Sequence, residues 1–236
     1  MIVKRLRHTL AIGTTLLALL GTARAEELKA NASIALHSGQ VAGTGFTVVD
    51  NPVVQGSLDI TKNPLALGAW FDYDLKRENV NEFDFTARVE LGDYAGIHTQ
   101  LYGGYFTFPG LQLPDAQEVG LTLSTTTLPV DISLYGAKIF GDASGKGGYA
   151  SLTIGKSYPL TDAIRVNASV MAGFNHHYFT ESTGISHGSV DLSVPVSLGG
   201  FTITPAVKFL KTDPGHRFPG VFKDQIGGGI TIGTEF

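Results

Sequence analysis

A period-two alternation of apolar and polar residues, sustained over long segments, constrains the fold of this chain more than any other feature. From residue 82 to residue 91, every odd position is apolar and every even position is charged or Thr. Segments 164–174 and 189–194 alternate in the same way. This period is that of a β-strand with one apolar and one polar face. The pattern therefore predicts an all-β fold.

Twelve such segments follow one another, and their length indicates a membrane. Most contain 9–12 residues. Strands of soluble proteins usually have about 5–6 residues, whereas a tilted strand needs about 9–11 to cross a bilayer. Because open sheet edges cannot be hydrated in lipid, the strands must close on themselves. We therefore expect a transmembrane antiparallel β-barrel of about twelve strands. The segments are 28–37, 53–61, 65–75, 81–91, 95–107, 116–127, 130–140, 148–157, 163–174, 187–196, 200–211 and 225–236.

The connections between these segments alternate between long and short. The long ones are 38–52, 76–80, 108–115, 141–147, 175–186 and 212–224. Long loops at one end and short turns at the other are typical of outer-membrane barrels, whose short turns face the periplasm. Pro205 falls within an expected strand, where its missing N–H interrupts the hydrogen-bond ladder. We expect a β-bulge there, or different bounds for the strands that contain Pro195 and Pro205.

Both ends of the chain carry features of export. Residues 1–25 combine a basic start, an apolar run and the cleavage pattern Ala23-Arg24-Ala25, which is typical of a cleaved Sec signal peptide. The apolar run is about half of the ~20 residues that a membrane-spanning helix needs. Residues 26–236 would then form the barrel. The chain ends on Phe236, which resembles the C-terminal signal read by the barrel insertion machinery of the outer membrane.

Charge and cysteine content exclude other classes. Only 16% of the residues are charged, against roughly 25% in an ordinary soluble domain. Loss of residues 1–25 removes four of the 17 basic residues. The remaining chain has 13 basic and 21 acidic residues, so its net charge moves from −4 to −8. An acidic chain of this kind is a poor binder of nucleic acid, because contacts to phosphate need clustered Lys and Arg. Without Cys it has no disulfide and no Cys-ligated metal. We expect no cofactor, no catalytic residue and no metal; outer-membrane lipids surround the barrel.

Short motifs between residues 52 and 84 resemble a known family. They are Pro52-x-x-Gln55-Gly56 with Asp59, Gly68-x-Trp70 with Asp74, and Glu82-x-Asp84. These motifs are similar to those of the TorF family of outer-membrane porins, which carries P-A-x-Q-G-x-x-D, G-x-W and E-x-D at similar spacings. The chain differs upstream, where residues 33–39 contain no Arg. The resemblance implies a pore-forming barrel and brings no catalytic residue.

The polar parity of the strands predicts the lining of the lumen. Ten acidic and three basic residues share it: Asp59, Asp72, Asp74, Glu82, Asp84, Glu90, Glu118, Asp131, Asp191, Glu235, Arg88, Arg165 and Lys208. If Leu75 pairs with Asn81, Asp74 lies opposite Glu82 and Asp72 opposite Asp84. A slip by two residues keeps these four carboxylates on one face.

Carboxylates this close repel one another unless a cation intervenes. We therefore expect a constriction that favours cations, or a weak divalent-ion site, near the outer mouth. Asp72, Asp74, Glu82, Asp84 and Glu118 are its acidic candidates. The alternative is a solvated rim, or carboxylates that Arg88, Arg165 or Lys208 bridges.

The sequence predicts foremost a passive channel for small hydrophilic solutes or ions, and two other interpretations stay open. Loop 38–52 or loop 175–186 would plug a non-conducting, structural barrel. His187 and Ser189 form a pair of the kind used in nucleophilic catalysis, as in outer-membrane phospholipases, but their parity points Ser189 into the lumen. His176 and His177 with His187 suggest a metal, although adjacent His residues in a polar loop are usually just exposed. The sequence does not determine the solute or whether the barrel is a monomer or a homo-oligomer.

Overall fold

The computed structural model describes residues 28–41, 47–111, 113–140, 147–177, 183–212 and 224–236. The regular elements of this part are all strands: β1 (Lys29–His37), β2 (Gln40–Val41), β3 (Thr47–Val49), β4 (Val53–Lys62), β5 (Leu65–Asp74), β6 (Asn79–Tyr94), β7 (Ile97–Thr107), β8 (Ala116–Thr125), β9 (Asp131–Phe140), β10 (Gly148–Pro159), β11 (Arg165–His176), β12 (Thr183–Ser193), β13 (Val196–Leu198), β14 (Phe201–Thr212) and β15 (Gln225–Glu235). None of the described segments is a helix long and apolar enough to cross a membrane.

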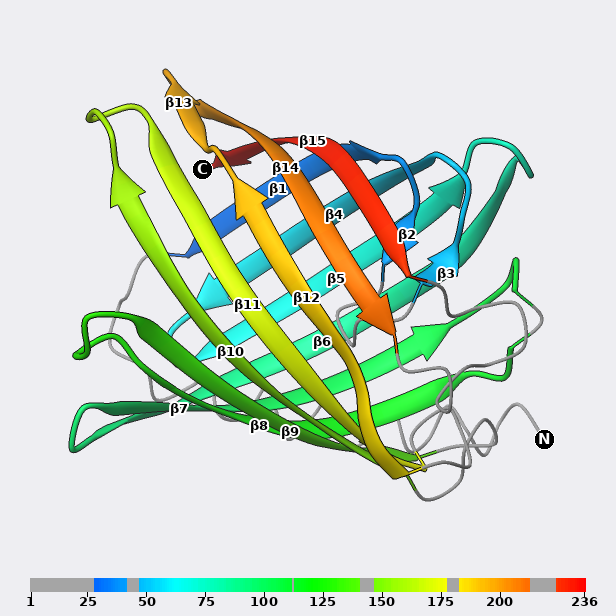
Figure 1. Cartoon of the computed structure of the whole chain (residues 1–236), viewed down its shortest axis with the longest axis horizontal. Helices are drawn as coiled ribbons and strands as arrows, with labels where there is room; N and C mark the ends of the chain where they lie inside the picture. Colours follow the sequence, from blue (N-terminus) through cyan, green and yellow to red (C-terminus); the bar gives the residue numbers. More distant parts are fainter. Residues whose placement is uncertain (1–27, 42–46, 112, 141–146, 178–182, 213–223) are drawn as a thin grey trace.

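The strands close into a ring. Neighbours pair antiparallel in chain order, and the first strand, β1, pairs with the last, β15. β12 and β13 keep one register on β14, since Ser193 pairs with Ala206 and Val196 with Ile203. They therefore act as one interrupted strand, and the barrel has twelve strands. Figure 1 shows these strands tilted around a common axis, with the small β2–β3 hairpin at one rim. The predicted fold class is confirmed.

Of the two alternatives expected at Pro205, the structure shows different strand bounds and no bulge. β14 pairs with β15 from Phe201 to Leu210 without a register shift. The carbonyl of Pro205 accepts the N–H of Val194 at 3.0 Å. Because the N and C=O of a strand residue point to the same neighbour, the missing donor of Pro205 faces the interruption between β12 and β13. The correction is to the strand bounds: the tenth spanning strand runs from Thr183 to Leu198, with a gap at residues 194–195.

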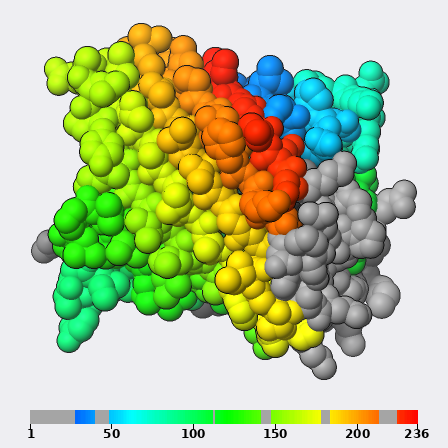
Figure 2. Space-filling model, viewed as in Figure 1, coloured from blue at the N-terminus to red at the C-terminus, as the bar shows by residue number. Residues whose placement is uncertain are grey.

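A belt of apolar side chains covers the outside of the barrel. Every spanning strand contributes at least one large apolar residue that is 39–55% exposed: Ile34, Leu58, Leu67, Phe85, Leu101, Leu121, Leu134, Leu152, Val170, Val190, Phe209 and Ile230. Figure 2 shows part of this outer wall, over β10 to β15, with closely packed side chains. A continuous apolar surface of this kind is stable in lipid and not in water. The belt therefore marks the surface that faces the membrane.

Some large luminal side chains lie flat over glycine positions of the wall. A Cβ added to Gly120 would stand 2.6 Å from the hydroxyl of Tyr135, and one added to Gly173 would overlap the ring of His187. These glycines thus give the rings of the neighbouring strands room to lie along the wall instead of across the lumen.

Candidate functional site: the acidic wall of the lumen

The β5–β6 hairpin brings the predicted carboxylates to the luminal face in a register two residues from the expected one. Asp72 pairs with Glu82, and Trp70 pairs with Asp84. The expected pairs of Asp74 with Glu82 and of Asp72 with Asp84 are therefore wrong. The register shifts between Asp72 and Tyr73, so that Asp74 lies opposite Asn79. For Asp72, Glu82 and Asp84 the slip is two residues, so these three carboxylates stay on one face of the hairpin.

Asp72 is fixed within the wall. Its side chain is fully buried. Its Oδ2 accepts a hydrogen bond from Gln55 Nε2 at 3.0 Å, and its Oδ1 accepts one from Asn81 Nδ2 at 2.6 Å. Amide donors on both sides satisfy this carboxylate, so it holds β4, β5 and β6 together at the level of the cluster.

Asp74 hydrogen-bonds to two loops at the long-loop end of the barrel, the one after β3 and the one after β5. Its carboxylate accepts hydrogen bonds from Asn51 Nδ2 at 2.8 Å and from the backbone N–H groups of Lys76 and Arg77 at 2.8 and 2.9 Å. Arg77 Nε lies 3.7 Å from it. Since the side chain is fully buried, these contacts give Asp74 a structural role in anchoring the loops after β3 and β5.

Glu82, Asp84 and Glu118 form the rest of the cluster, on β6 and β8. Glu82 and Asp84 lie two residues apart on β6 and share one face of that strand. Glu118 accepts a short hydrogen bond from the hydroxyl of Tyr135. Within the described residues, Asp84 Oδ1 and Asn81 Oδ1 are buried without a hydrogen-bond partner. Carboxyl groups gathered at one level of the wall produce a negative potential, which attracts cations.

Four aromatic rings continue this level across the wall. The ring centroids of Tyr102 and Tyr135 lie 6.1 Å apart, those of Tyr135 and Tyr149 lie 6.4 Å apart, and those of Tyr149 and His187 lie 6.0 Å apart. The row joins β7, β9, β10 and β12. It places weakly polar side chains beside the carboxyl cluster.

Two of the three basic residues predicted to line the lumen form ion pairs with acids outside the carboxyl cluster. Arg88 forms a short ion pair with Asp59, and Lys208 Nζ lies 3.2 Å from Asp191 Oδ1. Arg165 is the first residue of β11, at the short-turn end, where it pairs with Pro159. Bridging of the carboxyl cluster by Arg88 or Lys208 therefore competes with these ion pairs. Lys29, which the sequence analysis did not include, lies 3.7 Å from Glu235.

His187 and Ser189 do not form a catalytic pair. Ser189 Oγ donates to Asp191 Oδ2 at 2.9 Å. The two ring nitrogens of His187 lie 3.0 Å from Ser186 Oγ and 3.3 Å from the hydroxyl of Tyr149. Both side chains are buried on the luminal side, away from the lipid surface at which a phospholipase would act.

The histidines near the long-loop end do not gather into a metal site. His176 packs edge-on against His177 at 4.7 Å and lies 2.9 Å from Thr183 Oγ1. Across the described part of the chain, no group of three or more His, Asp or Glu residues is placed to hold a metal ion. The predicted plug loops 38–52 and 175–186 include residues 42–46 and 178–182, which lie outside the described residues.

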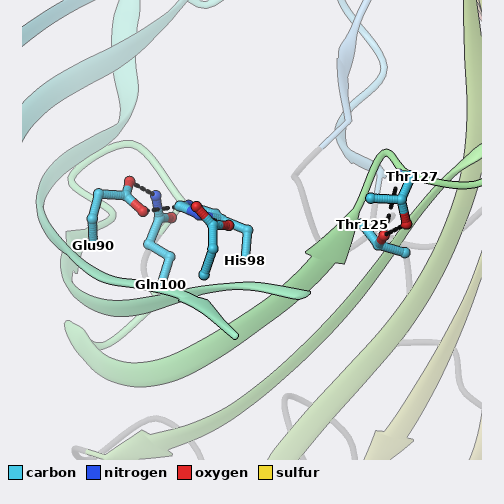
Figure 3. Close-up of polar contacts among 6 residues, drawn as sticks. Glu90, His98, Gln100, Thr125 and Thr127 are labelled. Atoms are coloured by element: carbon cyan, nitrogen blue, oxygen red, sulfur yellow. Dashed lines mark hydrogen bonds and ion pairs between the residues drawn. The ribbon is translucent and has the colours of Figure 1, made fainter. Parts of the chain in front are cut away.

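A second polar cluster lies at the short-turn end, on the β6–β7 hairpin (Figure 3). His98 Nε2 lies 2.5 Å from Glu90 Oε2, and His98 Nδ1 lies 3.1 Å from Asp93 Oδ1. Glu90 N donates to the carbonyl of Pro64 in the turn after β4, so the hairpin tip extends past that turn, outside the membrane-spanning part. Hydrogen bonds to Glu90 and Asp93 raise the pKa of His98.

The barrel is similar in structure to solved outer-membrane porins, although its sequence is not. No family model matches the sequence, and no curated protein does. The structure is similar to a KdgM porin in complex with disordered oligogalacturonate, with a TM-score of 0.58 and 7% identity over 88% of this chain and 99% of that one. It is also similar to a second structure of the KdgM porin, with a TM-score of 0.58 and 8% identity over 88% of this chain and 99% of that one.

A NanC porin in a rhombohedral crystal form gives a TM-score of 0.52 and 8% identity over 88% of this chain and 98% of that one. The chain has the fold of outer-membrane porins. The predicted location in the outer membrane agrees with this fold. At such low identity the likeness carries the fold alone, and function must be argued from the residues of this lumen.

Proposed function

We propose that this protein is an outer-membrane channel through which small hydrophilic solutes diffuse passively, and that its lumen favours cations and neutral solutes over anions. One observation supports the proposal: a closed barrel with an apolar outer belt, whose polar strand parity in the sequence holds more acidic than basic residues. The mechanism needs no covalent step, because a polar lining and its charge suffice to select among diffusing solutes. The motifs that resemble the TorF family support the same function.

The charge of the wall argues for a different solute from that of one structural neighbour. That KdgM porin is described in complex with oligogalacturonate, an acidic saccharide. In the present barrel, Asp72, Glu82, Asp84 and Glu118 lie together, while Arg88 and Lys208 pair with other acids. An acidic saccharide would be repelled by such a wall, so we propose cations or neutral polar molecules as solutes.

Ion selectivity in planar bilayers tests this proposal. With a KCl gradient, the wild-type channel should give a reversal potential of the sign expected for cations. Glu82→Gln with Asp84→Asn should shift that potential towards zero, and more so at low salt, where screening is weaker. Glu78→Gln with Asp162→Asn removes one Glu and one Asp from exposed turns and serves as the control. Equal shifts in both double variants, or anion preference in the wild type, would contradict the proposal.

A non-conducting structural barrel is the second candidate. It is favoured by one observation, the apolar side chains that fill part of the mouth at the long-loop end, where Phe108 and Ile139 are buried. Swelling of proteoliposomes in small sugars and salts separates the two candidates, because only an open barrel admits these solutes.

A further inference from the structure

An apolar cluster lies inside the mouth of the barrel. It contains Phe108, Ala116, Ile139 and Tyr149, which are 0–7% exposed, and the partly buried Phe106, Leu111, Leu113 and Tyr135 pack against it. Apolar residues of the outer belt are far more exposed; Leu134, on the same strand as Ile139, is 47% exposed. A buried apolar cluster is unexpected on the otherwise polar wall of a lumen.

Strand parity places this cluster on the luminal side. Ile139 alternates with the exposed Lys138 and Phe140, and Ala116 has the parity of Glu118. Phe106 pairs with Asp84 on one side and with Ala116 on the other. Ile139 pairs with Glu118. The wall therefore presents apolar side chains next to the carboxyl cluster, on the side towards the long loops.

The connection between β7 and β8 covers these wall residues. It supplies Phe108, Leu111 and Leu113, and a hydrogen bond from Leu111 N to the Phe108 carbonyl closes a turn. Gly110 approaches the opposite neighbour, β6, so closely that an added Cβ would stand 2.6 Å from the carbonyl of Val80. The connection thus reaches from the start of β6 to the wall residues of β9 and β10, and it is folded into the mouth.

We propose that residues 108–111 and 113 form a latch, an apolar element that narrows the mouth next to the carboxyl cluster and sets the size limit of the solutes. The proposal rests on the proposed channel function. An aqueous mouth exposes apolar wall residues only at a cost, so Ile139 and Tyr149 stabilise the inward position of the latch by being covered. Its two leucines supply the contacts that a polar substitution would remove.

Conductance of latch variants tests the proposal. Leu111→Asn with Leu113→Asn removes the contact from the loop side, and Ile139→Asn removes it from the wall side. Leu128→Asn with Leu160→Asn takes the same two side chains from exposed short turns and is the control. Each variant is first shown to be folded by heat-modifiable mobility in gels. Single-channel conductance and the largest sugar that enters proteoliposomes are then measured.

Each contact-removing variant should raise conductance by about two-fold or more and admit larger sugars, since conduction follows pore dimensions. Combining the loop-side and wall-side substitutions should raise conductance little further, because both remove the same contact between loop and wall. Wild-type conductance in folded latch variants would overturn the latch while leaving the channel function intact. Conductance only in the latch variants would support the latch and refute an open wild-type channel. If no variant conducts, both proposals fail.

Discussion

Substitution of Gly173 by Ala should destabilise the barrel through a ring on the neighbouring strand. An added Cβ would overlap the imidazole of His187. That ring is 2% exposed and lies between Ser186 and Tyr149, its hydrogen-bonding neighbours. It cannot move aside without losing these contacts, and the overlap cannot be relieved by a flexible chain end.

The expected loss follows from the two consequences of that overlap. Forcing an extra methyl group into a packed site costs about 1–3 kcal/mol. Each of the two hydrogen bonds of His187 contributes about 0.5–1.5 kcal/mol. The free energy of unfolding should therefore fall by about 2–6 kcal/mol.

Denaturant unfolding in lipid vesicles measures this change, with the fluorescence of Trp70, the single Trp, as the probe. Gly136→Ala is the matched control, because an added Cβ there meets nothing within 4 Å, and it should change stability by less than about 0.5 kcal/mol. In a His187→Ala background the effect of Gly173→Ala should shrink. An equal loss at both glycines, or an undiminished loss without the imidazole, would refute the reasoning.

Three further predictions concern loops, pH and assembly. Asp74→Ala leaves three donors without their carboxylate and should lower the free energy of unfolding by about 2–4 kcal/mol; limited proteolysis should then cut residues 75–78 faster, and unchanged cleavage would argue against the anchoring role. Because Glu90 and Asp93 raise the pKa of His98 above its ordinary 6.5, its charge stabilises the hairpin fully below that value, and this stabilisation is lost as pH rises through the raised pKa. An NMR titration of His98 with a midpoint at or below 6.5 would contradict this. Removal of Phe236 should lower the yield of inserted barrel in cells, and normal insertion would exclude an assembly signal at this residue.

The alternation of side chains predicts the barrel because parity and length are local properties of the sequence. Every spanning strand lies at a predicted segment, and the luminal parity of the acidic residues follows directly. Register is not local: the extra residue Asn81 on β6 shifts the pairing of Asp74, and no pattern in residues 75–82 indicates that bulge. Pro205 could not be placed from local sequence for the same reason: the strand break that accommodates it lies on the neighbouring strand, between β12 and β13.

Roles of individual carboxylates were harder to predict than their location. The sequence treats Asp72 and Asp74 as equivalent, yet amide side chains bind one and loop backbone binds the other. The charges on the polar face of β9 do not indicate the latch. Ile139, an apolar residue on the luminal parity, is the signal that indicates a covering loop.

The pairing of β1 with β15 joins the two ends of the sequence at a single seam, where Asn31 pairs with Glu235 and Ala30 bonds to Phe236 through the backbone. A truncated chain therefore cannot form the ring with one strand fewer and the same seam. Until β1 and β15 pair, the protein carries two unpaired strand edges that lipid cannot satisfy. Closure is consequently a single event that needs both β1 and β15, and a chain that lacks either strand should leave no partially working product.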